Sequence, residues 1–266
     1  MPMDFEKICL QVCELAREAG AFIRKERETF SKDKVEVKGV HDFVSYVDKA
    51  SENIIVERLK SILPEAAFLT EEQTVERAEA PLTWIVDPLD GTTNFIHGLY
   101  PNAVSIALMH NEEMVIGVVY EVGLNECFYA WKDSKAYLNG KVITVSDAEA
   151  LDSCLIGIGF PYHNFSRLDS YFSCIRYFAE HAQAMRRTGS AATDLSYVAC
   201  GRLDAYFEYS LNAWDVAAGA FILQRAGGKV ADFSGSNGYL FGQEMVAANA
   251  KVFSNFIAII KKNFGL

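Results

Sequence analysis

Apolar residues near the start of the chain recur at helical spacing. From Phe5 onward they follow an i, i+3, i+4, i+7 rhythm, which predicts an amphipathic helix ending near the charged run RKERE. A second helix is expected from about Asp48, and Pro64 ends it. The runs TWIVD, AVSIALMH and MVIGVVY then predict a buried strand and an antiparallel hairpin. Asn139-Gly140 predicts the turn of one more hairpin.

The pattern changes beyond about residue 150, where strand-like and helix-like segments alternate. Strands are expected at LIGIGF, DAYFEY, KVADF and EMVAAN, and helices at LDSYFSCIRYFAEHA, SAATDLSYVACG and WDVAAGAFILQRAGG and from Lys251. No repeat, low-complexity linker or Gly/Pro-rich hinge separates the parts of the sequence. We therefore expect an α/β fold made of two closely packed halves, residues 1–148 and residues 149–266.

The composition is that of a globular protein. The chain has 266 residues, of which 50% are hydrophobic, enough for one large or two modest domains. No apolar run reaches the ~18 residues of a membrane-spanning helix, so no membrane partner is expected. The N-terminus MPMDFEKICL carries acids and a lysine, unlike a signal peptide. The six cysteines are scattered without a C-x-x-C pair, which indicates the buried thiols of a cytoplasmic protein.

The net charge of −10 argues against a general nucleic-acid-binding surface, although it still allows a local basic patch. An acidic chain also repels phosphate compounds, so a cation would have to supply positive charge if the ligand were anionic. The sequence contains no Walker A loop, no G-x-G-x-x-G and no G-x-S-x-G. The sites that these motifs build are therefore not expected.

Two aspartates stand three residues apart in TWIVDPLDGTTNF. One interpretation is a type I turn, with Asp87 first and Pro88 second, which needs only one acid. The other is a metal site, because Pro88 fixes the backbone so that Asp87, Asp90 and the Leu89 carbonyl could converge on one point after an apolar strand. Residues 91–94 could then open a helix whose free N–H groups face an anion. Ligands that are all oxygen suit a hard cation such as Mg²⁺.

Three further acidic segments could reach such a site, although each has a simpler explanation. Glu71 and Glu72 follow the apolar run AAFL, where solvated loop acids would also be expected. Asp215 begins the apolar helix in NAWDVAAGA, where an acid favours the helix dipole. Asp48 in SYVDKAS could likewise be a helix cap. Both interpretations stay open for each residue.

Together these motifs resemble the inositol monophosphatase family of Mg²⁺-dependent, lithium-sensitive phosphatases. The string DPLDGTTNF, the upstream EE pair and the downstream WDVAAG carry the resemblance, and the order of elements extends it over essentially the whole chain. The segment MRRTGSAATDLSYVACGRLDAYFE is similar to bacterial members. The resemblance implies a layered αβαβα sandwich with the inositol monophosphatase or sugar-phosphatase-like fold. The acidic loop would lie in the first half, the second half would complete the active site, and the protein would be a homodimer.

The resemblance assigns metal-binding roles by position. Glu71, Asp87 and the Leu89 carbonyl would hold a first Mg²⁺. Asp87 would bridge to a second ion, held also by Asp90 and Asp215. A third, weaker ion would lie near Glu71.

The resemblance also implies catalytic and substrate-binding residues. Asp48 and Thr92 would form a pair that orients the attacking water, with Glu71 as the third catalytic side chain. The remaining implied residues are Gly91, Thr92 and Thr93 at the phosphate, Gly189, Ser190, Ala191, Glu208 and Asp215 along the substrate alcohol, and Lys38 and Glu72 beside the metal ligands.

Electrostatics agrees with a metal site. Asp48, Glu71, Asp87, Asp90 and Asp215 would bring their carboxylates into one pocket. Like charges ~4 Å apart repel by roughly 1 kcal/mol in water and by several more where solvent is scarce. Such a cluster is tolerable only with divalent cations or raised pKa values. Two or three Mg²⁺ would reverse the local charge, lower the pKa of a bound water and clamp the attacking and leaving oxygens.

Several positions depart from the family pattern or stay ambiguous. Thr70 stands where the family commonly has Gly, Pro101 is displaced, and Asn212 lies at a variable position near the substrate alcohol. His97 is expected beside the site or at the surface. Arg186-Arg187 is either a phosphate-binding pair or an interface pair.

The expected reaction is hydrolysis of a small polyol phosphate, myo-inositol 1-phosphate foremost, by a metal-activated water. Fructose-1,6-bisphosphatase, histidinol-phosphatase and 3′-phosphoadenosine phosphatase activities are alternatives within the superfamily. Some bacterial members also join RNA polymerase and RNA in transcription antitermination, but the charge argues against direct RNA binding and the complete metal set against an inactive enzyme. A generic α/β ligand-binding domain would leave the placed acids without a purpose.

Overall fold

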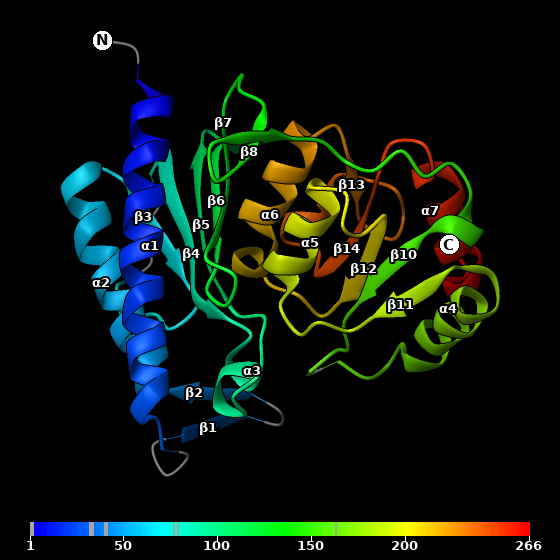
Figure 1. Cartoon of the computed structure of the whole chain (residues 1–266), viewed down its shortest axis with the longest axis horizontal. Coiled ribbons are helices and arrows are strands. Elements are labelled where there is room, and N and C mark those ends of the chain that lie inside the picture. Colours follow the sequence, from blue (N-terminus) through cyan, green and yellow to red (C-terminus); the bar gives the residue numbers. More distant parts are fainter. Residues whose placement is uncertain (1–2, 32–34, 40–41, 77, 79, 163) are drawn as a thin grey trace.

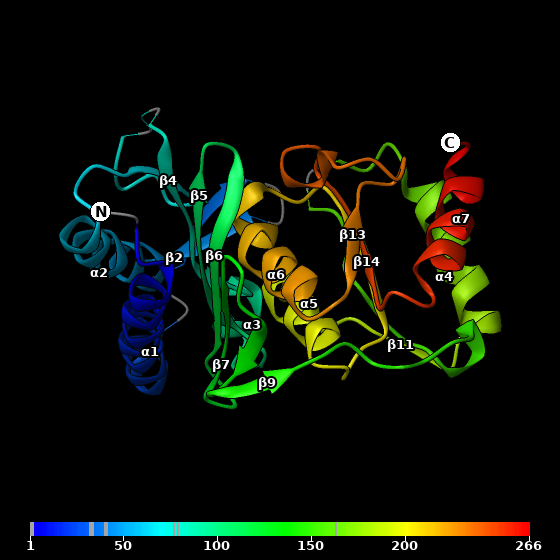
Figure 2. The ribbon, with the colours of Figure 1, turned by 90° about the horizontal axis from the view of Figure 1, so that it is seen from above.

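Figure 1 shows the computed structural model of the chain, which describes residues 3–31, 35–39, 42–76, 78, 80–162 and 164–266. Five layers follow one another: a helix pair, a sheet, a second helix pair, a second sheet and a third helix pair (Figures 1 and 2). This arrangement is the αβαβα sandwich that the resemblance implied.

The first sheet has seven strands, and their order in the sheet is their order in the chain. Neighbouring strands are antiparallel, except that β3 and β4 are parallel. The helices α1 (Phe5–Thr29) and α2 (Tyr46–Ile62) cover its outer face (Figure 1). The strands are β3 (Ala67–Thr70), β4 (Leu82–Asp90), β5 (Ala103–His110), β6 (Glu113–Glu121), β7 (Glu126–Trp131), β8 (Ala136–Leu138) and β9 (Lys141–Ile143).

The second sheet is mixed and has five strands in the order β11, β10, β12, β14, β13. β10 is parallel to β11 and β12, whereas β14 is antiparallel to β12 and β13. Its strands are β10 (Leu155–Ile158), β11 (Ala184–Arg186), β12 (Ala205–Tyr209), β13 (Lys229–Ala231) and β14 (Glu244–Ala248).

The remaining elements are helices and one small hairpin. Helices α5 (Ala191–Ala199) and α6 (Ala213–Arg225) lie between the two sheets, and α4 (Leu168–His181) and α7 (Phe253–Phe264) cover the far face of the second sheet (Figure 2). The shorter elements are β1 (Val35–Gly39), β2 (Asp42–Ser45), α3 (Thr92–Ile96) and the 3-10 helices η2 (Leu151–Ser153) and η3 (Gly238–Leu240).

The middle core is built by both halves of the chain. It joins buried Ile85 and Phe128 of the first sheet to Leu195 of α5. The first sheet and α6 approach each other closely at Gly117 in β6, which has no side chain. A Cβ there would lie 2.7 Å from the Ala218 carbonyl oxygen in α6. The boundary predicted between residues 148 and 149 falls between β9 and η2, and the middle core crosses it.

Most elements predicted from the sequence are present. The turn at Asn139 and Gly140 joins β8 to β9, and both residues have positive φ, 47° and 82°. β4 is longer than predicted, because it continues to Asp90 with an irregular register between Asp87 and Asp90. The β1–β2 hairpin, β7 and β11 were not predicted. Among the described residues, no helix has the length and apolar character needed to cross a membrane.

Candidate active site

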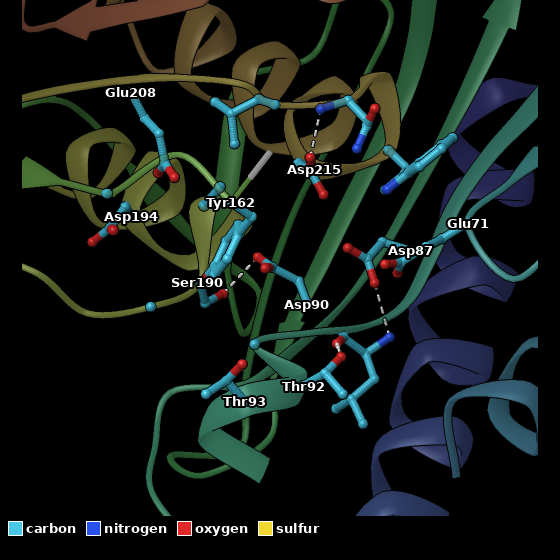
Figure 3. A pocket seen from close by; sticks show the side chains of 18 of the residues that line it. Glu71, Asp87, Asp90, Thr92, Thr93, Tyr162, Ser190, Asp194, Glu208 and Asp215 are labelled. Carbon is cyan, nitrogen blue, oxygen red and sulfur yellow. Dashed lines mark hydrogen bonds between the residues drawn. The ribbon is translucent and has the colours of Figure 1, made fainter. Parts of the chain in front are cut away.

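One cavity of about 420 Å³ opens between the two halves of the chain. The end of β4 and the loop after β3 line one side, and β12 and the segments that precede α5 and α6 line the other. Figure 3 shows Glu71, Asp87, Asp90 and Asp215 around the same space. Three separate segments of the sequence therefore bring these four acidic side chains to one pocket.

The loop at the end of β4 is fixed by its own side chains. Asp87 Oδ1 accepts a hydrogen bond from the Leu89 N–H at 2.9 Å, within the predicted acidic turn. Gly91 follows with φ of 92°, which favours glycine. A Cβ there would lie 3.0 Å from the Pro101 carbonyl oxygen and 3.2 Å from that of Gly189. Gly91 is therefore required both by its backbone conformation and by the close approach of two other segments.

Asp48 caps a helix and also contacts the β4 loop. Its Oδ2 accepts from the Ser45 N–H at 2.8 Å and forms a capping box with Ser45 at the start of α2. Its Oδ1 lies 2.8 Å from Thr92 Oγ1, which is also 3.0 Å from the Leu89 carbonyl oxygen. The single hydroxyl hydrogen of Thr92 can be donated to only one of these acceptors at a time. Burial raises the pKa of Asp48.

The buried surroundings of the pocket disfavour the ionised forms of the acids that face it. Glu71 and Asp87 are hydrogen-bonded to each other, and burial followed by repulsion between neighbouring carboxylates raises both pKa values well above normal. Burial also raises the pKa of Asp90 to about 6 and that of Asp215 to about 7. In the described part of the chain, no three His, Cys, Asp or Glu side chains already form a metal-ligand group. Without a cation, the raised pKa values shift all four carboxyl groups toward their protonated forms.

Hydrogen bonds that Asp90 accepts tie the two halves of the chain together. Its Oδ2 accepts from Ser190 Oγ and from the Ala192 N–H, both at 2.7 Å, at the start of α5. Asn94 adds a second tie, since its Nδ2 donates to the Thr188 carbonyl oxygen at 2.9 Å. The predicted substrate residues 189–191 are thereby held against the predicted metal loop.

Glu208 forms the far wall of the pocket. It is 7% exposed, accepts a hydrogen bond from the Tyr206 hydroxyl, and has its pKa raised by burial to about 8. A Cβ on Gly159, at the end of β10, would lie only 1.8 Å from Glu208 Oε2. Glu208 can occupy its position only because residue 159 has no side chain.

Asp215 is likewise both a helix cap and a pocket residue. Its Oδ2 accepts from the Asn212 N–H at 2.6 Å, which forms the capping box of α6. It also lines the pocket. Asp215 is thus a helix cap that also lines the pocket, whereas Asp48, which was predicted to share the pocket, is not among the lining residues and reaches it only through Thr92.

Tyr162 and Asp194 line the pocket but were not predicted as site residues, and Arg187, for which a phosphate-binding role and an interface role had both been left open, lines it as well. Arg187 donates to the Tyr162 hydroxyl at 2.8 Å, and Asp194 lines the pocket with one carboxylate oxygen that is buried without a hydrogen-bond partner. Among the lining residues that the structure describes, Arg187 is the one basic side chain. The Arg-Arg pair was a usable signal for Arg187, whereas Tyr162 and Asp194 lie in no motif.

The other predicted residues fall in different places. Thr93 and Glu72 line the pocket. His97 is exposed at the end of α3 and is not among the lining residues. The side chain of Lys38, in β1, lies outside the described residues.

Comparisons with known proteins agree with this fold. A family model described as "Inositol monophosphatase family" matches residues 4–263. The chain is 42% identical over 246 residues to the "Putative Nus factor SuhB" of Neisseria meningitidis serogroup B, which covers 92% of this chain and 94% of that protein.

Solved structures show the same fold. The extragenic suppressor protein suhB from Bartonella henselae is 34% identical, with a TM-score of 0.90 over 95% of this chain and 97% of that one. The Thermotoga maritima IMPase is 31% identical, with a TM-score of 0.86 over 95% and 96%. Sequence and fold thus match from end to end, and the chain belongs to the inositol monophosphatase family.

Proposed function

We propose that the protein is a Mg²⁺-dependent phosphomonoesterase that hydrolyses a small polyol phosphate, with myo-inositol 1-phosphate as the first candidate substrate. The observation that carries the proposal is the convergence of Glu71, Asp87, Asp90 and Asp215 on one pocket in which ionised carboxylates are disfavoured. A bound cation would stabilise the ionised carboxylates that are otherwise unfavourable in this pocket. Members of the family are generally Mg²⁺-dependent.

The donor set of the pocket fits this ion. The four carboxyl groups and the Leu89 carbonyl would hold two or three Mg²⁺, and all of these donors are oxygens, which hard divalent cations prefer. Bound Mg²⁺ supplies positive charge to the phosphate and lowers the pKa of a water molecule. The carboxyl groups would release their retained protons on binding the ions, so uptake should be accompanied by proton release.

The chain's own residues would position the water and the phosphate. When Thr92 Oγ1 donates to Asp48 Oδ1, its lone pairs can accept a hydrogen from a water molecule in the pocket. The water would then be held in one orientation for attack, with Glu71 beside it. Gly91 and Thr93, which both line the pocket, would contact the phosphate.

The far wall would bind the substrate alcohol. With a pKa of about 8, Glu208 carries a proton at neutral pH in the metal-free protein and can both donate and accept hydrogen bonds. That property suits a leaving group rich in hydroxyls. Gly189, Ser190 and Ala191 would lie along the same alcohol. Phosphate release from a panel of inositol, sugar, histidinol and nucleotide phosphates would rank this substrate against the superfamily alternatives.

Asp90→Asn tests the metal role. Asparagine keeps a carbonyl oxygen that can accept the bonds from Ser190 and Ala192, so the loop should stay folded. Loss of the charge should lower Mg²⁺-dependent phosphate release by on the order of 100-fold or more, the scale for removing one charged contact to the transition state. Calorimetry should show weaker Mg²⁺ binding, and the thermal midpoint without Mg²⁺ should not fall.

The control is Asp152→Asn, which changes an exposed acid in η2. It should leave both Mg²⁺ binding and turnover unchanged. Wild-type turnover in the Asp90→Asn protein, or no Mg²⁺ uptake by the wild-type protein, would remove the proposed metal role.

A second candidate function is binding to the transcription machinery. The observation that favours it is the name "Putative Nus factor SuhB" of a relative that is 42% identical over 92% of this chain. We expect RNA polymerase to co-purify with the tagged protein from its native host if this function holds. The Asp90→Asn variant separates the two functions, because it should lose phosphatase activity and keep the partner.

A further inference from the structure

One face of α2 contacts both acid-bearing loops of the site. Asp48, Ser51 and Glu52 lie at i, i+3 and i+4, which places them on the same side of the helix, and each is 0% exposed. Asp48 contacts Thr92, as described above. Ser51 Oγ donates to the Pro88 carbonyl oxygen at 3.1 Å. These two residues thus fix the β4 loop, which carries Asp87 and Asp90.

Glu52 fixes the other loop, which follows β3 and carries Glu71. Its Oε2 accepts from the Glu72 N–H at 2.7 Å. Its Oε1 accepts from the Thr74 N–H at 2.8 Å and from Thr74 Oγ1 at 2.7 Å. A fully buried carboxyl group would cost several kcal/mol if it were left without partners, and these three donors provide them.

The start of the loop is also tied to β4. β3 ends at Thr70, and the next backbone tie runs from the Glu71 N–H to the Val86 carbonyl oxygen at 3.2 Å. Glu52 therefore connects the residue after Glu71 to the same rigid helix that holds the β4 loop. The helix α2 thus adds ties beyond Glu71 to the direct contacts between the two loops, which include the hydrogen bond between Glu71 and Asp87.

We propose that Glu52 is a positioning residue that holds the Glu71 loop against the β4 loop, so that the two loops can bind one divalent cation together. The inference rests on the proposed function, since it requires Glu71 and Asp87 to be metal ligands. Glu52 itself does not line the pocket among the described residues, and it acts only through the backbone of its neighbours.

Glu52→Gln tests this role with almost no change in shape. The amide retains one carbonyl oxygen, and its NH₂ group would face an N–H donor, so at least one of the three bonds is lost. In the metal-free protein, the Glu72 and Thr74 amides should exchange their hydrogens at least ~10-fold faster, while amides in β5 and β6 keep their wild-type rates. Mg²⁺ affinity measured by calorimetry should fall about 10- to 100-fold, as for other residues that support metal ligands.

The kinetic readout separates positioning from general destabilisation. The Mg²⁺ concentration for half-maximal phosphate release should rise with the loss of affinity, whereas kcat at saturating Mg²⁺ should change much less. Glu57→Gln is the matched control, because it makes the same change at an exposed position of the same helix. It should match the wild type in exchange, affinity and kinetics.

A milder variant covers the case in which Glu52→Gln fails to fold. Thr74→Val removes only the hydroxyl donor at an exposed residue, and it should weaken Mg²⁺ binding by a few-fold. Wild-type exchange and wild-type Mg²⁺ affinity in the variants, with binding intact in the wild type, would overturn the role of Glu52 alone. Absence of Mg²⁺ binding in the wild type would instead overturn the proposed function and this inference with it.

Discussion

Single acidic side chains in this protein serve both the fold and the pocket. Asp48 uses Oδ2 to cap α2 and Oδ1 to contact Thr92. Asp215 caps α6 while it lines the pocket. A helix begins at each of these points, and its first residues are held in place by the cap. The cap therefore fixes the direction in which the remaining carboxylate oxygen faces.

Burial of Glu208 predicts a pH dependence of stability in the metal-free protein. The pKa of Glu208 is raised from 4.5 to about 8, so between these pH values the folded state keeps a proton that the unfolded state has lost. Its contribution to stability is complete below pH ~4.5 and is lost as the pH rises through ~8, by about 1.4 kcal/mol per pH unit.

Glu208→Gln should remove this contribution. Between pH 5 and pH 8, urea unfolding in the presence of a chelator should show the variant gaining roughly 2 to 4 kcal/mol relative to the wild type. Tyr206→Phe removes the hydrogen bond that lowers the pKa of Glu208, so it should shift the transition to higher pH. Equal pH dependence in the wild type and Glu208→Gln would contradict the assignment.

At the scale of elements, packing depends on glycines where a helix meets a strand. Gly20 in α1 faces β6, and a Cβ there would lie 2.2 Å from Cε1 of the fully buried Tyr120. The Tyr120 ring has little freedom to move, because its hydroxyl is bonded to Arg24 and Asn125. The first helix layer therefore lies as close to the sheet as its backbone allows.

Gly20→Ala should destabilise the protein despite the higher helix propensity of alanine. Overpacking costs about 1 to 3 kcal/mol, which outweighs the ~1 kcal/mol gained from propensity. Thermal and urea unfolding should both show the loss. Glu18→Ala, at an exposed position of the same helix, should change stability by less than ~0.5 kcal/mol. A Gly20→Ala protein as stable as the wild type would show that α1 can move away from the sheet.

Long periodic segments could be predicted from the sequence, and short ones could not. The periodic apolar face of α1 and the β-branched runs of β5 and β6 each repeat several times, so their type was clear. β11 has only three residues, too few to show a local pattern. It forms because it pairs with β10, a parallel strand that lies far from it in the sequence. β4 was predicted too short because Asp and Pro resemble a turn, whereas β5 pairs with it up to Asp90.

The candidate site shows the same limit. The acidic motifs predicted that Asp87, Asp90 and Asp215 would share one pocket, because their spacing within each motif is recognisable, and these residues do line it. Arg187, Tyr162 and Glu52 reach the site or its loops only through tertiary contacts. Arg187 stands in an Arg-Arg pair whose role the sequence left open, whereas no local pattern marks Tyr162 or Glu52. The metal-binding, catalytic and substrate-binding roles of the motif residues stay predictions until they are measured.

At the scale of the whole molecule, α5 and α6 are shared by both sheets. Their apolar side chains complete the middle core, which joins residues from both halves. Asp90 and Asn94 add hydrogen bonds across the same junction. The two halves therefore depend on each other for burial.

Thermal unfolding of the full chain should accordingly be a single cooperative transition, with matching midpoints by far-UV circular dichroism and tryptophan fluorescence. A fragment of residues 1–148 should lack a cooperative transition, because the inner face of its sheet would be exposed. Two separated transitions, or a stable fragment, would show that the halves are independent domains. Light scattering on the same sample would test the homodimer that the family resemblance implies.

The absence of a side chain at Gly159 has a consequence for engineering the protein. Under the proposed function, any larger residue there would push Glu208 out of its position and so change the part of the cavity where the leaving group would bind, although no polar residue had been substituted. Substrate range could thus drift through a change in bulk alone, at a place that a survey of charged and hydroxyl-bearing side chains would overlook.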